Sequence, residues 1–188
     1  MENTLKNLAA AFAGESQARN RYTIYAKIAK KEGFEQIADI FLKTADNERE
    51  HAKWLMKLIN RIKEDDEALM IEAEVPTVIG TTEENLKAAI EGENFENTKM
   101  YPEFATVADK ENMGEIAARL RAIGTVEKHH EERYKKLLSD VKNKTVFEKE
   151  KDVLWVCRKC GFVHKGKKAL EKCPSCDHPQ SYFEVLKE

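Results

Sequence analysis

The sequence predicts a mainly α-helical protein, a four-helix bundle that continues into a small β module. Three observations predict this fold class. The chain combines 35% charged residues with only 8 glycines and 4 prolines among 188 residues, a composition typical of long helices and unlike that of a sandwich or barrel. Four stretches repeat apolar residues at alternating spacings of three and four, as the helices of a bundle do. All 4 cysteines follow residue 156, which marks the C-terminal end as a different unit.

The first half of the bundle is predicted from two such stretches, residues 5–29 and 37–58. Gly33 lies between them and is expected to end the first helix. The connection that follows, from about residue 61 to 82, is long and contains Pro76. Because the other connections are short, one long crossover in the middle of the chain predicts a ferritin-like four-helix bundle.

The second half of the bundle is predicted from the apolar spacing of residues 86–100 and 116–141. Thr81 and Glu84 have the spacing of a capping box, which predicts the start of the third helix. Pro102 lies in the continuation of that helix and is expected to bend it or to interrupt its hydrogen bonds. Residues 112–114, Asn-Met-Gly, separate it from the fourth helix.

The bundle is therefore predicted for residues 1–142. The mostly charged residues 143–152 are predicted to form a linker, which would span at most about 35 Å if extended. The remaining segment, residues 153–188, is too short to fold by apolar burial alone. Segments of this size usually need a metal or disulfides.

The charge balance excludes several classes of partner. Lys and Arg number 32 against 34 Asp and Glu, a formal net charge of -2, so neither nucleic acid nor an anionic membrane is expected to bind. No window approaches the roughly 18 apolar residues of a membrane span, and the first residues lack the apolar run of a signal peptide. We therefore expect a cytoplasmic protein.

Charged residues occupy core positions of the predicted bundle. They are Glu15, Glu48, His51, Glu93, Glu96, Glu127 and His130. A buried carboxylate without a partner costs several kcal/mol, so such residues have to be paired or bound to a cation. Three pairs among them are three residues apart, which places both members on one face of a helix.

Two Glu-x-x-His pairs, joined by single glutamates from the other two helices, form the ligand set of carboxylate-bridged dimetal bundles. Open coordination positions suit iron or manganese. A lone Glu-x-x-His on a charged helix is usually solvated, but here the pair occurs twice in register with the core. Tyr22 and Tyr101 lie near Glu15 and Glu93; they either pack in the core or donate hydrogen bonds to ligand carboxylates. Glu131 and Glu132 are expected to face solvent.

The cysteines form two close pairs, Cys157-x-x-Cys160 and Cys173-x-x-Cys176. Two such pairs bind one tetrahedral metal. The spacing alone does not choose between structural zinc and redox-active iron. Nearby aromatic residues are expected to surround the site, and they are Trp155, Phe162, Tyr182 and Phe183.

Motifs along the whole chain match those of one known family. They are Ala-Gly-Glu-Ser at 13–16, Glu48-Arg-Glu-His51, Glu91-Gly-Glu-Asn-Phe-Glu96, Met100-Tyr-Pro-Glu-Phe104, Glu127-Lys-His-His130 and Cys173-Pro-Ser-Cys-Asp-His-Pro-Gln180. The chain thereby resembles the rubrerythrin family nearly end to end. Its tail resembles a short rubredoxin module, which implies one iron held by four cysteines.

The resemblance also implies a role for each charged core residue. Glu48 and Glu127 are implied to bridge two irons, with Glu15 and Glu93 as terminal ligands. His130 is implied to bind the second iron.

On the first iron, His51 and Glu96 are implied to alternate as the oxidation state changes. Tyr22 and Tyr101 match tyrosines of the family beside the diiron site. The implied activity is the reduction of hydrogen peroxide to water in oxidative-stress defence. Electrons are implied to come from an NAD(P)H-dependent reductase, often with a rubredoxin, and to cross between the chains of a head-to-tail homodimer.

Two other functions fit parts of the pattern. A diiron oxidase or ferroxidase would consume dioxygen and store iron, although storage needs no attached one-electron relay. A helical scaffold with a structural zinc ribbon would bind a partner without catalysis.

Overall fold

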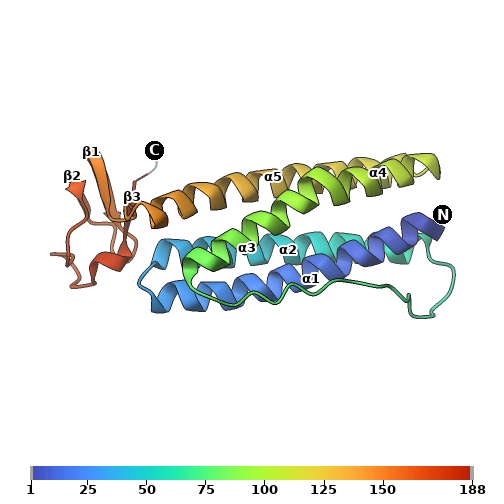
Figure 1. The fold of residues 1–188 in the computed structure, drawn as a ribbon, viewed down its shortest axis with the longest axis horizontal. Helices are drawn as coiled ribbons and strands as arrows, with labels where there is room; N and C mark the ends of the chain where they lie inside the picture. The colour runs from blue at the N-terminus through green and yellow to red at the C-terminus, as the bar shows by residue number, and fades with distance from the viewer. Residues whose placement is uncertain (1, 187–188) are drawn as a thin grey trace.

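Two long antiparallel helices, α1 (Glu2–Lys31) and α2 (Glu35–Ile62), form one half of the bundle in the computed structural model, which describes residues 2–186 (Figure 1). Gly33 makes the turn between them with φ of 82°, a left-handed conformation that glycine adopts without strain. Residues 1, 187 and 188, at the outer ends of the two predicted domains, lie outside the described residues.

The long crossover, residues 63–81, runs back along α1 to the other end of the bundle (Figure 1). Side chains of α1 and of the crossover hold it in place. The Tyr25 hydroxyl donates a hydrogen bond to the Val78 carbonyl at 2.8 Å, and Leu69 and Ile71 pack against the core. The position of this segment confirms the predicted topology of one central crossover.

The third helix consists of α3 (Thr82–Phe95), a π-helical turn η1 (Glu96–Met100) and α4 (Tyr101–Lys110). The predicted capping box of Thr81 and Glu84 opens α3. Pro102 has no N–H to donate to the carbonyl of Thr98 in an α-helical ladder. Instead, the Tyr101 N–H donates to the carbonyl of Glu96, five residues earlier. The predicted interruption therefore takes the form of a π turn.

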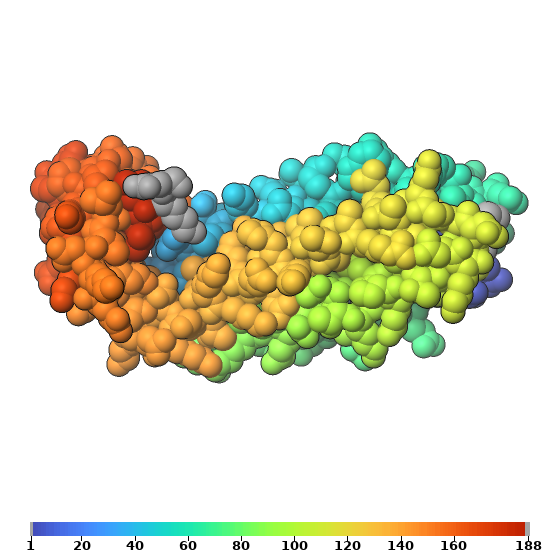
Figure 2. Space-filling view, turned by 90° about the horizontal axis from the view of Figure 1, so that it is seen from above, coloured from blue at the N-terminus to red at the C-terminus, as the bar shows by residue number. Residues whose placement is uncertain are grey.

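The last helix, α5 (Gly114–Lys142), completes the bundle alongside α3 and α4 (Figures 1 and 2). Apolar residues form two clusters within the bundle. One contains Leu8, Leu55, Tyr101, Ala105 and Leu120. The other contains Tyr22, Phe41, Leu86, Tyr134 and Leu137. On every helix the charged core residues lie between members of these two clusters, so the bundle has a polar layer in its middle.

The tail forms a three-stranded antiparallel sheet in the order β2-β1-β3. The strands are β1 (Glu148–Cys157), β2 (Val163–Lys168) and β3 (Phe183–Val185), and a 3-10 turn η2 (Gln180–Tyr182) precedes β3. Trp155 and Phe183 are buried in its core, as expected. β1 begins inside residues 143–152, where Glu148 pairs with Lys168 of β2; an irregularity follows, and regular pairing resumes at Val153. Only residues 143–147 connect the bundle to the sheet.

The sheet packs against the end of the bundle where α1 turns into α2 (Figure 2). The Arg158 guanidinium forms an ion pair with Asp39 of α2 at 2.8 Å. Phe147 stacks on Phe34 with a centroid distance of 6.3 Å. These contacts fix the tail beyond the end of the helices. Among residues 2–186, no helix combines the length and apolarity needed to cross a membrane.

Candidate metal centres

Six of the seven charged core residues converge in two overlapping groups. Within each group, the ligand atoms lie within 4.8 Å of one another; the groups are Glu15, Glu48, His51 and Glu127, and Glu48, Glu93, Glu127 and His130. Glu48 and Glu127 belong to both. Two metal positions that share two carboxylates follow from this arrangement.

The two oxygens of each shared carboxylate face different histidines. Nδ1 of His51 lies 3.1 Å from Oε2 of Glu48 and 2.9 Å from Oε1 of Glu127. Nδ1 of His130 lies 3.3 Å from Oε1 of Glu48 and 2.8 Å from Oε2 of Glu127. Each carboxylate can therefore bind one metal through each oxygen, which is the geometry of a bridge.

The hydrogen bonding of these residues fits bound cations. Both oxygens of Glu48 and of Glu127 are buried without a hydrogen-bond partner in the described part of the chain, and so are Nδ1 of His51 and of His130. Unpaired buried carboxylates are costly, whereas metal ions satisfy them. Carboxylates and imidazoles in this ratio suit a pair of irons.

Two buried tyrosines donate hydrogen bonds to Glu15 and Glu93, the glutamates that belong to one metal group each. The Tyr22 hydroxyl donates to Oε1 of Glu93 at 2.5 Å, and the Tyr101 hydroxyl donates to Oε1 of Glu15. Oε2 of each glutamate has no hydrogen-bond partner among residues 2–186 and is left for a metal. Burial, followed by the nearby carboxylates, raises the pKa of both phenols well above the usual value, so they remain donors. Of the two interpretations of these tyrosines, the structure supports the hydrogen-bonding one.

Glu96 is the one charged core residue outside both groups. It begins the π turn, is half-buried, and borders a cavity of about 300 Å³ between α1, the π turn and the crossover. Gly14 of α1 lines the same cavity, and a Cβ added to it would lie 3.9 Å from Oε1 of Glu96. The structure therefore places His51 at the first metal position and Glu96 beside it, next to an opening.

The expectation that Glu131 faces solvent is wrong, because this residue is only 4% exposed. Its carboxylate accepts hydrogen bonds from Asn94 and Asn97 across the interface between α5 and the third helix. The charge of Glu131 and its position next to His130 gave no indication that it is buried. The only sequence signal was the pair Asn94 and Asn97, which are three residues apart and therefore lie on one face of the third helix. Glu132 is exposed, as expected.

Without metal, the bundle is expected to lose stability as the pH rises from about 6 to above 8. Burial raises the pKa of Glu15 and of Glu93 to about 8. Although burial alone would lower it, the neighbouring carboxylates, first Glu127, raise the pKa of His130 to about 11. In this range the folded chain holds more protons than the unfolded chain, so stability declines with pH. Urea unfolding of the metal-free protein at pH 6, 7 and 8.5, followed by circular dichroism, measures the decline.

The iron-loaded protein is the control, because metal binding requires deprotonated ligands and strengthens as the pH rises. A metal-free protein whose urea midpoint stays constant or rises over this range would contradict the assigned protonation of the polar layer.

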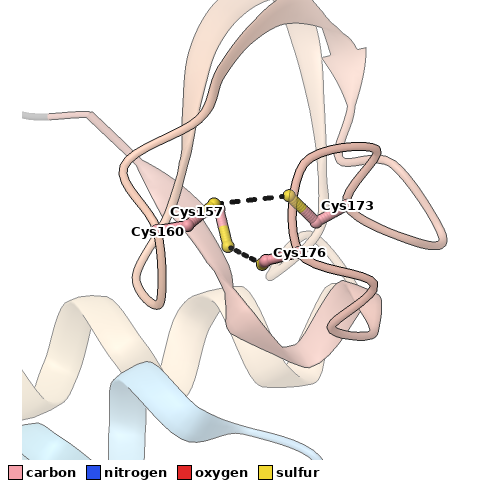
Figure 3. Close-up of side chains that lie close together, drawn as sticks. All are labelled: Cys157, Cys160, Cys173 and Cys176. Atoms are coloured by element: carbon pink, nitrogen blue, oxygen red, sulfur yellow. Dashed lines mark hydrogen bonds between the residues drawn. The ribbon is translucent and has the colours of Figure 1, made fainter.

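The four cysteines of the tail lie together at one end of the sheet (Figure 3). Sγ of Cys157 is 3.7 Å from Sγ of Cys176, and Sγ of Cys160 is 3.6 Å from Sγ of Cys173. Four sulfurs bound to one tetrahedral metal at about 2.3 Å would lie about 3.7 Å apart. The cysteines are free thiols, and their spacing fits one metal.

Each cysteine pair lies in its own turn, and the two turns have the same hydrogen-bond pattern. The Gly161 N–H donates to the Cys157 carbonyl at 2.8 Å, and the Asp177 N–H donates to the Cys173 carbonyl at 3.0 Å. Both residues have positive φ, 79° for Gly161 and 60° for Asp177. Each turn folds the chain back over the sulfurs, and Cys160 lies at the surface.

Comparison with known proteins covers both parts of the chain. The sequence model of the Rubrerythrin family matches residues 6–138, and that of the rubrerythrin, rubredoxin-like domain matches residues 155–184. A putative rubrerythrin of Methanocaldococcus jannaschii is 66% identical over 98% of this chain and 93% of its own. A rubrerythrin of Nitratidesulfovibrio vulgaris is 46% identical over 97% of this chain and 94% of its own.

Solved structures with a similar fold match nearly the whole chain. The structure of nigerythrin in a mixed-valence state superposes with a TM-score of 0.65 at 32% identity, over 97% of this chain and 86% of that chain. The similarity therefore extends over the bundle and the tail together.

Proposed function

Because the chain belongs to the rubrerythrin family of diiron proteins in oxidative-stress defence, we propose that it is a peroxidase that reduces hydrogen peroxide to water. The observation that carries the proposal is the pair of shared carboxylates beside an open cavity, with a half-buried glutamate, Glu96, at its edge. A reducing compartment such as the cytoplasm suits the four free thiols.

The reaction breaks one O–O bond, consumes two electrons and two protons, and yields two waters. A pair of irons held by these residues would supply two electrons at once and offer open positions to a small oxidant. Glu48 and Glu127 would hold both metals, with Glu15 and His51 on the first and Glu93 and His130 on the second. Tyr22 and Tyr101 keep the terminal glutamates oriented through their hydrogen bonds.

His51 and Glu96 are proposed to exchange at the first metal. The carboxylate suits ferric iron, which is the harder ion, and the imidazole suits ferrous iron. Glu96 belongs to neither metal group and borders the cavity, which would give its side chain room to approach the first metal. Gly14 contributes to this freedom, since it adds no side chain to the cavity wall.

The tail is proposed to relay electrons one at a time from a rubredoxin or an NAD(P)H-dependent reductase. Its four-cysteine site lies beyond the end of α5, and from His130 to Lys142 this helix rises about 18 Å. That separation favours a relay between the chains of a homodimer, from the tail of one protomer to the bundle of its partner.

The experiment that tests the activity compares peroxide with dioxygen. The iron-loaded protein is supplied with NADH, a rubredoxin and its reductase, and NADH oxidation is followed with each oxidant in turn. Peroxide turnover well above dioxygen turnover supports the proposal. Faster turnover with dioxygen would support a diiron oxidase instead. A colourless native tail that contains zinc would exclude the relay, since thiolate-bound ferric iron is red.

Replacing Gly14 with alanine is expected to stabilise the bundle and to slow peroxide reduction. Glycine inside a helix is less favourable than alanine by about 0.5–1 kcal/mol, so thermal unfolding of the metal-free variant should occur at a higher temperature. The added Cβ would lie 3.9 Å from Oε1 of Glu96 and narrow its space. Gly114→Ala is the matched control, because nothing lies within 4 Å of a Cβ at that position. Equal turnover in both variants would show that Gly14 has no functional role.

A further inference from the structure

Glu131 has three polar partners that the proposed reaction does not use. Its Oε1 accepts from Nδ2 of Asn94 at 3.0 Å and from Nζ of Lys135 at 2.5 Å. Its Oε2 accepts from Nδ2 of Asn97 at 3.3 Å. Although Glu131 follows His130 directly, it belongs to neither metal group. The carboxylate therefore faces the third helix and not the metals.

The two asparagines flank Glu96 in the chain. Asn94 lies in the last turn of α3 and Asn97 is the second residue of the π turn. One carboxylate on α5 thus holds the side chains of residues on both sides of the residue proposed to move. The α-helical hydrogen-bond ladder is interrupted here, so side-chain contacts have to supply the rigidity that regular helix would give. Hydrogen bonds to the charged, buried carboxylate of Glu131 can supply this rigidity, because they are stronger than hydrogen bonds between neutral groups.

We propose that Glu131 is a positioning residue that fixes the junction of α3 and the π turn, so that Glu96 moves by its side chain alone. The effect on turnover rests on the proposed function. The effect on backbone rigidity does not, and it can be measured in the protein without metal.

The first test is amide hydrogen exchange of the full-length, metal-free chain. In Glu131→Ala, exchange across residues 95–101 is expected to accelerate about tenfold or more, because local opening no longer breaks charged hydrogen bonds. Glu132→Ala, which removes the exposed neighbouring carboxylate, should leave this segment unchanged. Unchanged exchange in Glu131→Ala, or an equal acceleration in all helices, would overturn the proposal.

The second test is kinetic and uses the iron-loaded protein. Glu131→Ala is expected to keep both bundle irons and the KM for peroxide but to lower kcat about tenfold. Glu131→Gln retains one acceptor oxygen and should recover part of the loss. Asn97→Ala, a smaller change at a half-buried position, should act in the same direction, and the double variant should be no worse than Glu131→Ala.

Additive effects of the two substitutions, or loss of iron in place of loss of kcat, would refute a positioning role for Glu131. If the unaltered protein reduced no peroxide, the proposed function would be wrong. The hydrogen-exchange result would still show whether Glu131 fixes the junction of α3 and the π turn.

Discussion

Replacing Glu48 with alanine is expected to remove both metals from the bundle. Each oxygen of this carboxylate faces a different histidine, so the substitution takes one ligand from each metal position. The iron content should fall from about three atoms per chain to about one, held by the tail. Peroxide turnover should fall by at least about 100-fold. Metal analysis and reductase-linked peroxidase assays measure both losses.

Two other glutamates serve as comparisons for Glu48. Glu96→Ala should keep both bundle irons, because Glu96 belongs to neither metal group, while it slows peroxide reduction. Glu50→Ala removes a carboxylate that is 47% exposed on the same helix as Glu48, and it should change neither quantity. Equal loss of metal from the Glu48 and Glu96 variants would rule out an exchangeable role for Glu96.

Two inactive variants are expected to restore activity when they form a hybrid dimer. One chain carries Cys157→Ser and Cys160→Ser and has no relay. The other carries Glu48→Ala and Glu127→Ala and has no diiron site. If electrons cross between chains, a hybrid contains one intact relay opposite one intact diiron site. A symmetric dimer has two such contacts, so the hybrid should show about half of the unaltered activity.

The measurement uses co-expressed chains with different affinity tags, so that hybrids can be isolated from either homodimer. Each homodimer lacks one of the two components and serves as the inactive control. Inactive hybrids with full metal in each remaining site would show that electron transfer stays within one chain, or that no dimer of this kind forms.

Much of the fold was predictable because local and long-range signals agree. The scarcity of glycine and proline, the spacing of apolar residues and the capping box at Thr81 all favour the same helices, and the structure contains them. The charged layer was predictable for a related reason. A glutamate at a core position is so costly that its repetition on four helices indicates bound cations.

Other features depend on contacts that periodicity does not encode. Glu131 is buried because Asn94 and Asn97 face it across an interface, and no pattern within α5 alone reveals those partners. β1 begins in a charged segment whose first residue, Glu148, pairs with Lys168 of β2 while its side chains stay largely outside the core, so apolar periodicity does not mark it. The separation of Glu96 from the metal groups likewise depends on the local shape of the π turn.

The π turn also determines which face of α4 points toward the core. Glu93 faces the polar layer and Tyr101 faces Glu15, although they are eight residues apart instead of the seven that two regular turns would require. One surplus residue in an α-helix rotates everything after it by about 100°. By absorbing that residue, the π turn lets α4 present Tyr101, Ala105 and Ala108 to the same core as α3. A regular α-helix through the same unaltered sequence would turn that whole face of α4 about 100° away from the metals, whereas deleting one residue within Glu96–Met100 would remove the π turn and keep the face in place.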